Sequence, residues 1–329
     1  MRIIETITDS EKVKKGCVLT IGNFDGVHIG HQEILTTAVQ IAAQRSTELV
    51  VMTFEPHPVA VLHPEKAPGV LTPLGLKERL LAEFGVDCLV VLKDSAELLN
   101  LSPRGFVDEF LMKNIQPAVV VEGGNFNFGY GRSGDVQTLR ELAAQRGFEV
   151  VIVPAKQLLL SSGENVAASS SLIRNLLEKG RVADAVKALG RPYRLIGKTV
   201  AGKGKGRELG FPTANIEPAE QIIPAEGVYA GFVEIGRNYE QVCKAHNKLP
   251  AALSIGRAKT FITDHSLLTE AHILKGAVGD LSGKWLAMDF VEFIRHQERF
   301  ESENQLADQI AKDCKQAKKI LATDEHRFH

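Results

Sequence analysis

Short apolar runs alternate with amphipathic segments over roughly the first half of the chain. The runs are continuously apolar, as strands covered on both faces of a parallel sheet must be. The segments between them repeat apolar residues at helical spacing. The predicted strands are Cys17–Ile21, Leu49–Phe54, Cys88–Leu92, Ala118–Glu122 and Glu149–Val153, and the predicted helices are Gln32–Arg45, Gly75–Phe84, Pro103–Lys113 and Val136–Arg146. This alternation predicts an α/β domain with a doubly wound parallel sheet, whose ligands bind at the carboxyl ends of the strands.

The pattern changes near residues 186–192. Helical spacing continues to Leu189, and Gly190-Arg191-Pro192 then ends it. Beyond this point short strands are separated by turns, which predicts a small antiparallel β-barrel. The predicted strands are Arg194–Val200, Val228–Ile235, Ala251–Ile255, Leu268–Leu274 and Lys284–Phe293, and a last helix is capped by Ser302 with Leu306, Ile310 and Ala317 on its inner face. We therefore expect two domains, residues 1–186 and 187–329.

Composition narrows the class of protein. A chain of 329 residues with 44% hydrophobic and 24% charged residues is typical of a soluble protein with room for two domains. A net charge of −1 gives no basic surface for nucleic acid. The four cysteines are far apart and form no metal-type pair, which indicates reduced thiols, and the N-terminus has neither a signal peptide nor a membrane span. We expect a cytoplasmic monomer or weak homo-oligomer with small-molecule partners and no nucleic acid or membrane.

A glycine-rich turn follows the first predicted strand, in the order Ile21-Gly22-Asn23-Phe24-Asp25-Gly26-Val27-His28-Ile29-Gly30-His31. A strand, a glycine turn and a helix start together make a phosphate site, because free backbone N–H groups and the positive end of the helix dipole point the same way. His28 and His31 lie three residues apart on one helix face and can reach the same anion. The helix dipole favours neutral imidazole donors here. Incidental histidines in a plain turn are the alternative, and the His-x-Gly-His spacing after a buried strand argues against it.

Two more loops follow strands of the predicted sheet. Phe54-Glu55-Pro56-His57-Pro58 comes after the second strand, and its two prolines make a rigid wall at the sheet edge. Asn125, Phe126 and Phe128 come after the fourth, where glycines allow a ligand to approach the backbone and two phenylalanines can face a flat ring. A stiff loop and ordinary core phenylalanines are the alternatives that the residues leave open.

A run of three serines, Ser169, Ser170 and Ser171, opens a later helix, and Arg174 follows one turn on. Helix capping explains serines at such a position. Three hydroxyl groups beside a guanidinium also make a second phosphate clamp. Two phosphate-binding helix starts in one domain suit a triphosphate held from both sides.

Basic and glycine residues gather at the start of the second domain. The segment from Gly197 to Gly204 lacks the final Ser/Thr of a P-loop and is not followed by a helix, so we reject that interpretation. In the string Gly202-Lys203-Gly204-Lys205-Gly206-Arg207-Glu208-Leu209-Gly210-Phe211-Pro212-Thr213-Ala214-Asn215, the flexible first part can cover phosphates. A rigid Pro-Thr-Ala-Asn turn then offers a hydroxyl and an amide to Mg²⁺.

The glycine-rich string resembles the signature of the HxGH nucleotidyltransferases, and in its full form that of prokaryotic bifunctional riboflavin kinase/FAD synthetases. Phe-x-Pro-His-Pro resembles part of that family's flavin site, and the serine run resembles its Ser-Ser-Thr-x-Ile-Arg. Asn125 replaces a common aspartate, and Ser171 replaces a threonine. The resemblance implies His28 and His31 as catalytic residues. It implies that ATP and FMN contact Gly22, Asn23, Phe24, Asp25, Gly30, Pro56, His57, Pro58, Asn125, Phe126, Phe128, Ser169, Ser170, Ser171 and Arg174.

The second domain resembles the riboflavin kinase of the same family through Gly-Phe-Pro-Thr-Ala-Asn and Glu270-Ala271-His272. The resemblance implies Glu270 as the base that activates riboflavin, Asn215 as a catalytic residue, and Thr213 and Asn215 as ligands of Mg²⁺. Gly202, Lys203, Gly206, Arg207, Gly210, Pro212 and Thr213 would bind the nucleotide. Lys259, Lys275 and Ser282 stand where the family has other residues.

The resemblance implies two reactions: ATP phosphorylates riboflavin to FMN, and ATP then adenylylates FMN to FAD and pyrophosphate. The departures at Lys259, Lys275 and Ser282 leave an alternative, in which the second domain binds flavin or nucleotide but has weak or no kinase activity, as a flavin sensor would. A class I aminoacyl-tRNA synthetase shares His-Ile-Gly-His. It is disfavoured because a Lys-Met-Ser-Lys-Ser element, an anticodon-binding domain and a basic charge balance are lacking.

Overall fold

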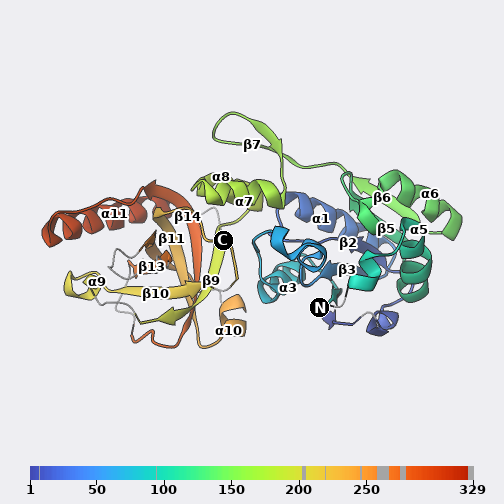
Figure 1. Cartoon of the computed structure of the whole chain (residues 1–329), viewed down its shortest axis with the longest axis horizontal. Coiled ribbons are helices and arrows are strands. Elements are labelled where there is room, and N and C mark those ends of the chain that lie inside the picture. Colours follow the sequence, from blue (N-terminus) through green and yellow to red (C-terminus); the bar gives the residue numbers. More distant parts are fainter. Residues whose placement is uncertain are drawn as a thin grey trace. The chain divides into compact units, whose positions relative to one another are not determined.

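A computed structural model of the chain describes all residues except 7, 94, 202–204, 219, 245–246, 258–266, 275–278 and 325–329. The chain divides into two compact units (Figure 1). The first comprises residues 1–68, 76–159 and 164–169, and the second comprises residues 69–75, 160–163 and 170–329. Helices α7 (Ser170–Glu178) and α8 (Val182–Leu189) are grouped with the second unit. The expected boundary between residues 186 and 187 concerns the two catalytic domains, and it stays a prediction.

The first unit is built on a six-stranded parallel sheet with the strand order β1-β4-β3-β2-β5-β6. Its strands are β1 (Arg2–Ile4), β2 (Val18–Ile21), β3 (Leu49–Phe54), β4 (Cys88–Leu92), β5 (Val119–Gly123) and β6 (Glu149–Val153). The prediction of a doubly wound parallel sheet is confirmed. β1 was not predicted, because it has only three residues and two of them are exposed.

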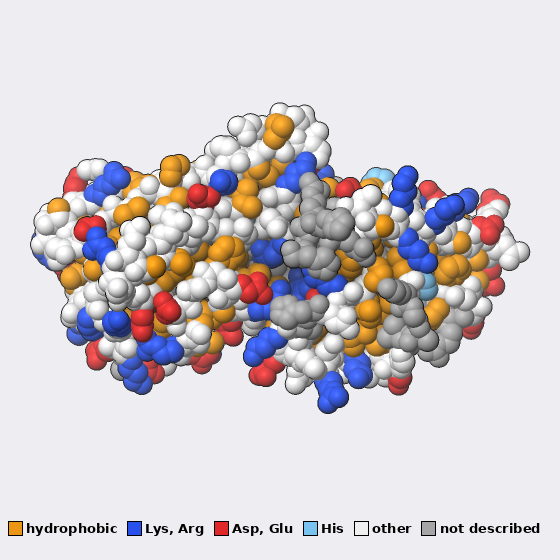
Figure 2. All heavy atoms as spheres, turned by 180° about the vertical axis from the view of Figure 1, so that it is seen from behind, with side chains coloured by type: hydrophobic (Ala, Val, Ile, Leu, Met, Phe, Trp, Pro, Cys, Tyr) orange, Lys and Arg blue, Asp and Glu red, His pale blue; other side chains and the backbone are white. Residues whose placement is uncertain are grey.

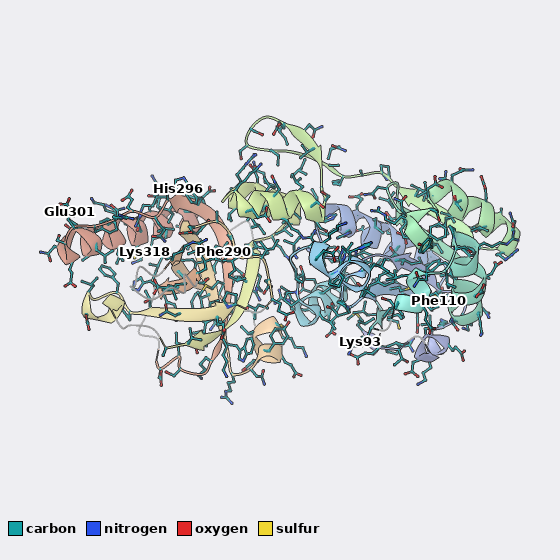
Figure 3. All side chains as sticks on the ribbon, viewed as in Figure 1. Lys93, Phe110, Phe290, His296, Glu301 and Lys318 are labelled. Carbon is teal, nitrogen blue, oxygen red and sulfur yellow. The ribbon has the colours of Figure 1, made fainter. Side chains whose placement is uncertain are left out.

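Helices pack against this sheet because its strands are apolar on both faces. The elements between the strands are η1 (Thr8–Lys12), α1 (Ile29–Gln44), α2 (Pro58–Leu62), η2 (Pro64–Lys66), α3 (Leu74–Glu83), α4 (Ala96–Leu99), α5 (Pro103–Gly105), η3 (Phe106–Ile115), η4 (Tyr130–Arg132) and α6 (Val136–Arg146). Side chains of β2, β3 and β4 share a core with η3 and α6, in which Phe110 is buried (Figure 3). The helix predicted at Pro103–Lys113 is a short α-helix that continues as the π-helix η3.

A small hairpin of β7 (Gln157–Leu159) and β8 (Asn165–Ala167) follows the sheet. The sequence analysis did not predict it. Both strands are three residues long and carry mostly exposed side chains, so they lack the apolar alternation that identifies a strand.

The second unit contains a closed antiparallel barrel with the strand order β10-β13-β12-β11-β14-β9. Its strands are β9 (Tyr193–Val200), β10 (Thr213–Pro218), β11 (Gly227–Gly236), β12 (Leu249–Arg257), β13 (Leu267–Ile273) and β14 (Trp285–Arg295). The barrel prediction is confirmed. One local prediction is wrong: Thr213-Ala214-Asn215 is not a rigid turn but the start of β10, paired with β13 and with β9.

Helices cover the outside of the barrel. α10 (Tyr239–Lys244) and α11 (Glu303–Asp324) pack against its strands, and the short helix α9 (Lys205–Glu208) precedes β10. Backbone N–H of Gln305 donates to Ser302 Oγ (3.2 Å), which confirms Ser302 as the cap of the last helix. Cys314, Ala317 and Leu321 of α11 pack against β11, β12 and β14, and Phe290 of β14 is fully buried (Figure 3).

Acidic and basic side chains are interspersed on the face of the molecule seen in Figure 2, as the near-zero net charge leads one to expect. Within the described part of the chain, no helix combines the length and apolarity needed to cross a membrane.

Candidate active sites

The glycine-rich turn lies between β2 and α1, and its backbone has a conformation that residues other than glycine seldom adopt. Phe24 and Val27 have φ angles of 46° and 38°, and Gly26 has a φ of 86°. Positive φ at residues with a side chain is strained, and such strain is concentrated at ligand-binding turns. The turn is held in place because Phe24 and Val27 are buried in the unit.

His28 is the N-cap of α1. Its Nδ1 accepts hydrogen bonds from the backbone N–H of Gly30 (3.2 Å) and of His31 (3.3 Å). Accepting them requires a lone pair on Nδ1, so the proton of a neutral His28 ring sits on Nε2. A Cβ on Gly30 would lie 3.1 Å from the His28 ring, and glycine therefore gives the imidazole the room that it occupies.

The two histidine rings lie together, as the spacing predicted. Their centroids are 3.7 Å apart with an angle of 20° between the planes, and the Phe24 ring lies 5.0 Å from His31. The pair stands at the amino end of a 16-residue helix whose first turn contains no acidic residue. The helix dipole and the backbone donors therefore favour an anion beside these rings.

The proline loop after β3 is joined to the glycine-rich turn. The Asn23 side-chain amide hydrogen-bonds to Nε2 of His57 (2.8 Å), and the Thr53 hydroxyl donates to the Asn23 carbonyl (3.1 Å). His57 also caps α2, since its Nδ1 accepts from Val59 N–H (3.1 Å). The structure thus brings together Asn23 and His57, two predicted site residues from different loops.

The loop after β5 differs in part from the prediction. The rings of Phe126 and Phe128 are stacked, with centroids 5.6 Å apart, but Phe128 is buried in the core and also contacts Phe106. Phe126 is half-buried and Asn125 is exposed, so these two can face a ligand while Phe128 supports Phe126 from below. A Cβ on Gly129 would lie 2.7 Å from Pro103 N, so this glycine serves packing rather than ligand approach.

Glu122 is a buried carboxyl group for which no role was predicted from the sequence. It lies at the end of β5, and its Oε1 accepts from the backbone N–H of Ile21 (2.6 Å). Burial raises the pKa of Glu122 well above its ordinary value, and the Ile21 hydrogen bond offsets only part of that effect. The side chain anchors the last residue of β2 before Gly22.

The serine run spans the sequence boundary between the first and the second unit. Ser169 belongs to the first unit, whereas Ser170, Ser171 and Arg174 belong to the second, at the start of α7. Arg174 Nε donates to the carbonyl of Gly69 (2.7 Å), which is in the same unit. The second phosphate clamp therefore stays a prediction.

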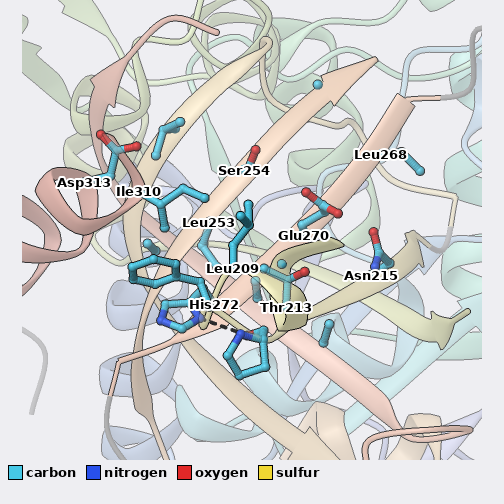
Figure 4. A pocket seen from close by; sticks show the side chains of 18 of the residues that line it. Leu209, Thr213, Asn215, Leu253, Ser254, Leu268, Glu270, His272, Ile310 and Asp313 are labelled. Atoms are coloured by element: carbon cyan, nitrogen blue, oxygen red, sulfur yellow. Dashed lines mark hydrogen bonds between the residues drawn. The ribbon is translucent and has the colours of Figure 1, made fainter. Parts of the chain in front are cut away.

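Polar side chains of three neighbouring barrel strands face one cavity of about 2190 Å³ (Figure 4). Asn215 of β10 lies directly opposite Glu270 of β13, and Glu270 lies opposite Ser254 of β12. Paired residues on adjacent strands point to the same face. Thr213, two residues before Asn215, lines the same cavity, so the three predicted residues Thr213, Asn215 and Glu270 are brought together.

The carboxyl group of Glu270 is suited to accept a proton. Burial raises its pKa above the ordinary value for glutamate. Glu270 is half-buried, whereas Asn215 opposite it is buried, with 8% of its surface exposed. The described residues contain no cluster of three or more His, Cys, Asp or Glu that would hold a metal by themselves. Hydroxyl, amide and carboxylate oxygens are nevertheless the donor types that Mg²⁺ accepts alongside water and substrate phosphates.

His272 holds the beginning of β10. Its Nδ1 lies 2.9 Å from the carbonyl oxygen of Pro212, and its ring packs edge-on against Phe211. Gly206 is required by packing, because a Cβ there would lie 2.5 Å from the Phe211 carbonyl. Gly210 has a φ of 84°, which the turn before Phe211 requires.

Some predicted residues cannot be placed. Gly202 and Lys203 lie outside the described residues, as do Lys259 and Lys275, and the side chain of Arg207 is not described. Ser282 is described, and its N–H and hydroxyl both donate to Asp280 in a tight turn.

Comparison with known proteins finds a different family match for each half of the chain. Residues 10–167 match the family described as FAD synthetase, and residues 189–321 match riboflavin kinase. The chain is 35% identical to the bifunctional riboflavin kinase/FMN adenylyltransferase of Escherichia coli over 95% of its length and 96% of the relative. It is 32% identical to the protein of the same name from Pseudomonas fluorescens, over 99% and 100%.

A solved structure shares the whole architecture. The crystal structure titled as a macrolide-efflux protein from Streptococcus pneumoniae superposes with a TM-score of 0.81 at 29% identity, covering 95% of this chain and 97% of that one. Its title names another activity, whereas the sequence matches of both halves point to flavin enzymes.

Proposed function

This chain belongs to the family of bifunctional riboflavin kinase/FMN adenylyltransferases, and we propose which of its residues perform the two reactions. It phosphorylates riboflavin with ATP to FMN, and it transfers AMP from a second ATP to FMN, giving FAD and pyrophosphate. The alternative of an inactive second domain is not favoured, because the match to riboflavin kinase spans residues 189–321 and full-length relatives carry both names.

For adenylyl transfer, we assign the triphosphate to the start of α1. An oxygen of the FMN phosphate attacks the α-phosphorus of ATP, and the bond to the β-phosphate breaks to release pyrophosphate. His28 donates from Nε2, and His31, stacked on it at 3.7 Å, lies at the same helix end. Neither forms a covalent bond. They stabilise the charge that develops on the phosphates, so catalysis consists of positioning and electrostatics.

FMN is assigned to the loops that follow β3 and β5. Pro56, His57 and Pro58 form a wall that Asn23 fixes to the phosphate turn through its 2.8 Å contact with His57. Phe126 offers a half-buried ring for the isoalloxazine, and Asn125 offers a side-chain amide beside it. Ser169, Ser170, Ser171 and Arg174 complete the proposal as the second phosphate clamp.

For the kinase reaction, Glu270 takes the proton from the ribityl hydroxyl of riboflavin, whose oxygen then attacks the γ-phosphorus of ATP. Thr213 and Asn215 would hold Mg²⁺ together with the phosphates. The ion supplies charge neutralisation at the transferring phosphoryl group. Gly206, Gly210 and Pro212 shape the loop before β10, and Gly202, Lys203 and Arg207 are proposed to cover the nucleotide.

The observation that carries the adenylyltransferase assignment is the stacked His28–His31 pair at the amino end of α1. Purified protein with Mg²⁺ and ATP is given riboflavin in one tube and FMN in another, and flavins are separated by chromatography over time. FMN followed by FAD from riboflavin is the expected result. Conversion of FMN to FAD without any conversion of riboflavin would contradict the kinase assignment. No conversion of FMN would contradict the adenylyltransferase assignment.

Location and assembly complete the proposal. The four free cysteines are buried thiols, which suits a reducing compartment, and we place the protein in the cytoplasm. We propose a monomer or a weak homo-oligomer, which sedimentation at several protein concentrations would test.

A further inference from the structure

A lysine lies among the buried residues of α3. Lys77 is flanked by Leu76, Leu80 and Leu81, which face the core, and only 5% of its side chain is exposed. Removing an ammonium group from water is unfavourable unless nearby charges compensate for it. A lysine in this position therefore needs a reason that packing alone does not give.

The carboxylate of Glu55 lies beside the Lys77 ammonium group, and the charge of Asp25 also acts on it. The Lys77 Nζ lies 3.8 Å from Oε2 of Glu55, and the buried Asp25 attracts it as well. Burial lowers the pKa of Lys77, and Glu55 and Asp25 act in the opposite direction. Glu55 is the more exposed partner, with 39% of its side chain accessible.

The two carboxylates belong to the two loops of the adenylyltransferase site. Asp25 lies in the glycine-rich turn, three residues before His28, and Glu55 immediately precedes Pro56 in the proline loop. The same loops are already joined by the contact between Asn23 and His57. Lys77 of a third element, α3, pairs with Glu55 of the proline loop and is attracted by the charge of Asp25 in the glycine-rich turn.

We propose that Lys77 is a positioning residue for adenylyl transfer, whose ammonium group pairs with Glu55 and, together with the Asn23–His57 contact, holds the proline loop in register with the glycine-rich turn. The inference rests on the proposed assignment of these loops to ATP and FMN. Transfer requires the FMN phosphate in line with the α-phosphorus, so a small displacement of one loop against the other lowers the rate of the chemical step.

The test compares variants of the full chain in FMN adenylylation. Lys77→Met keeps the length of the side chain and removes its charge. We expect kcat to fall by about 10²-fold. KM for ATP and for FMN should change little, because substrate binding is retained while alignment is lost. Lys77→Arg keeps the charge, and its kcat should be at least about tenfold higher than that of Lys77→Met.

Two controls separate positioning from folding. Arg79→Met removes a cation from the same helix, but Arg79 pairs with Glu83 of α3 itself (3.1 Å), so FMN adenylylation should stay within about twofold. Riboflavin kinase activity of each variant reports on the rest of the chain and should also be unchanged. Failure of the loop assignment would be seen separately, as full FAD synthesis by a folded His28→Asn variant.

A double variant decides whether Lys77 acts through Glu55. If it does, Lys77→Met combined with Glu55→Gln loses no more activity than the worse single variant. Losses that multiply would overturn the proposal. So would an unchanged kcat in folded Lys77→Met, equal losses in Lys77→Met and Lys77→Arg, or a parallel loss of kinase activity.

Discussion

Asn215 of β10 lies directly opposite Glu270 of β13, and both side chains face the barrel cavity. This register places the proposed base beside a proposed ligand of the phosphate-bound cation. Glu270 is half-buried, and a raised carboxyl pKa makes it a better proton acceptor than an ordinary glutamate.

Glu270→Gln should stop FMN formation from riboflavin while FMN is still converted to FAD. The amide keeps the shape of the side chain and removes the base, which we expect to lower the kinase rate by about 10²-fold or more. In the wild type, kcat/KM for riboflavin should rise with pH through a pKa above the ordinary value for glutamate. Kinase activity that persists in Glu270→Gln would argue against the assignment.

The same substitution should not destabilise the protein at neutral pH. The folded-state pKa of Glu270 is raised, so the folded state holds its proton more tightly than the unfolded state does. Stability associated with this group is therefore present below the ordinary glutamate pKa and is lost as pH rises through the raised pKa. Thermal unfolding at pH 7 should show the melting temperature of Glu270→Gln at or above that of the wild type.

His28→Asn separates helix capping from catalysis. Asparagine is a good N-cap and can replace Nδ1 as acceptor for Gly30 and His31, but it does not place a donor where Nε2 is. We expect FAD formation to fall by about 10²-fold, as when one oxyanion donor is removed, with FMN formation and melting temperature retained. The exposed His63 of the same unit provides the control, since His63→Ala should leave both reactions unchanged. A normal rate of FAD formation in folded His28→Asn would mean that this histidine serves only as a cap.

Asp184 should contribute to stability at neutral pH. Burial alone would raise the pKa of this carboxylate, but hydrogen bonds from Ser161, Arg181 and Lys187 outweigh burial and lower it to about 2. The contribution is present above the ordinary aspartate pKa and is lost as pH falls from about 4 to about 2. Denaturant unfolding of Asp184→Asn at pH 7 should show a loss on the order of 2 kcal/mol, which disappears near pH 2. An equal loss at both pH values would point to packing instead.

The cysteines should resist modification in the folded protein. Cys17, Cys88, Cys243 and Cys314 are free and buried. Burial raises the pKa of Cys17 to about 12 and that of Cys314 to about 11, so little thiolate forms at pH 8. Titration with a thiol reagent should detect almost no reactive group in native protein and all four after unfolding. Rapid labelling of the native protein would show that these sites open to solvent.

Periodicity predicted the regular parts of the fold and failed where local sequence was ambiguous. The runs at Leu49–Phe54 and Cys88–Leu92 match β3 and β4 because buried parallel strands are continuously apolar. Thr213-Ala214-Asn215 follows a proline and has no apolar alternation. It therefore suggested a turn, although pairing with β13 and β9 makes it a strand.

The site residues divide in the same way. His28 and His31 were predictable because their spacing and the preceding strand define a helix start. Lys77 and Glu122 were not, since a lysine in an amphipathic helix and a glutamate at a strand end are usually exposed. Only the packing of α3 and β5 reveals that both are buried. The reverse holds for Phe128, which was expected to contact a ligand but lies in the hydrophobic core.

If one chain carries two independent catalytic sites, two variants that each lack one activity should complement each other. His28→Asn and Glu270→Gln are each supplied with riboflavin, ATP and Mg²⁺, alone and then mixed. We expect that His28→Asn stops at FMN, that Glu270→Gln leaves riboflavin unchanged, and that the mixture makes FAD from released FMN. Loss of both reactions in either folded variant, or a mixture that makes no FAD, would contradict it.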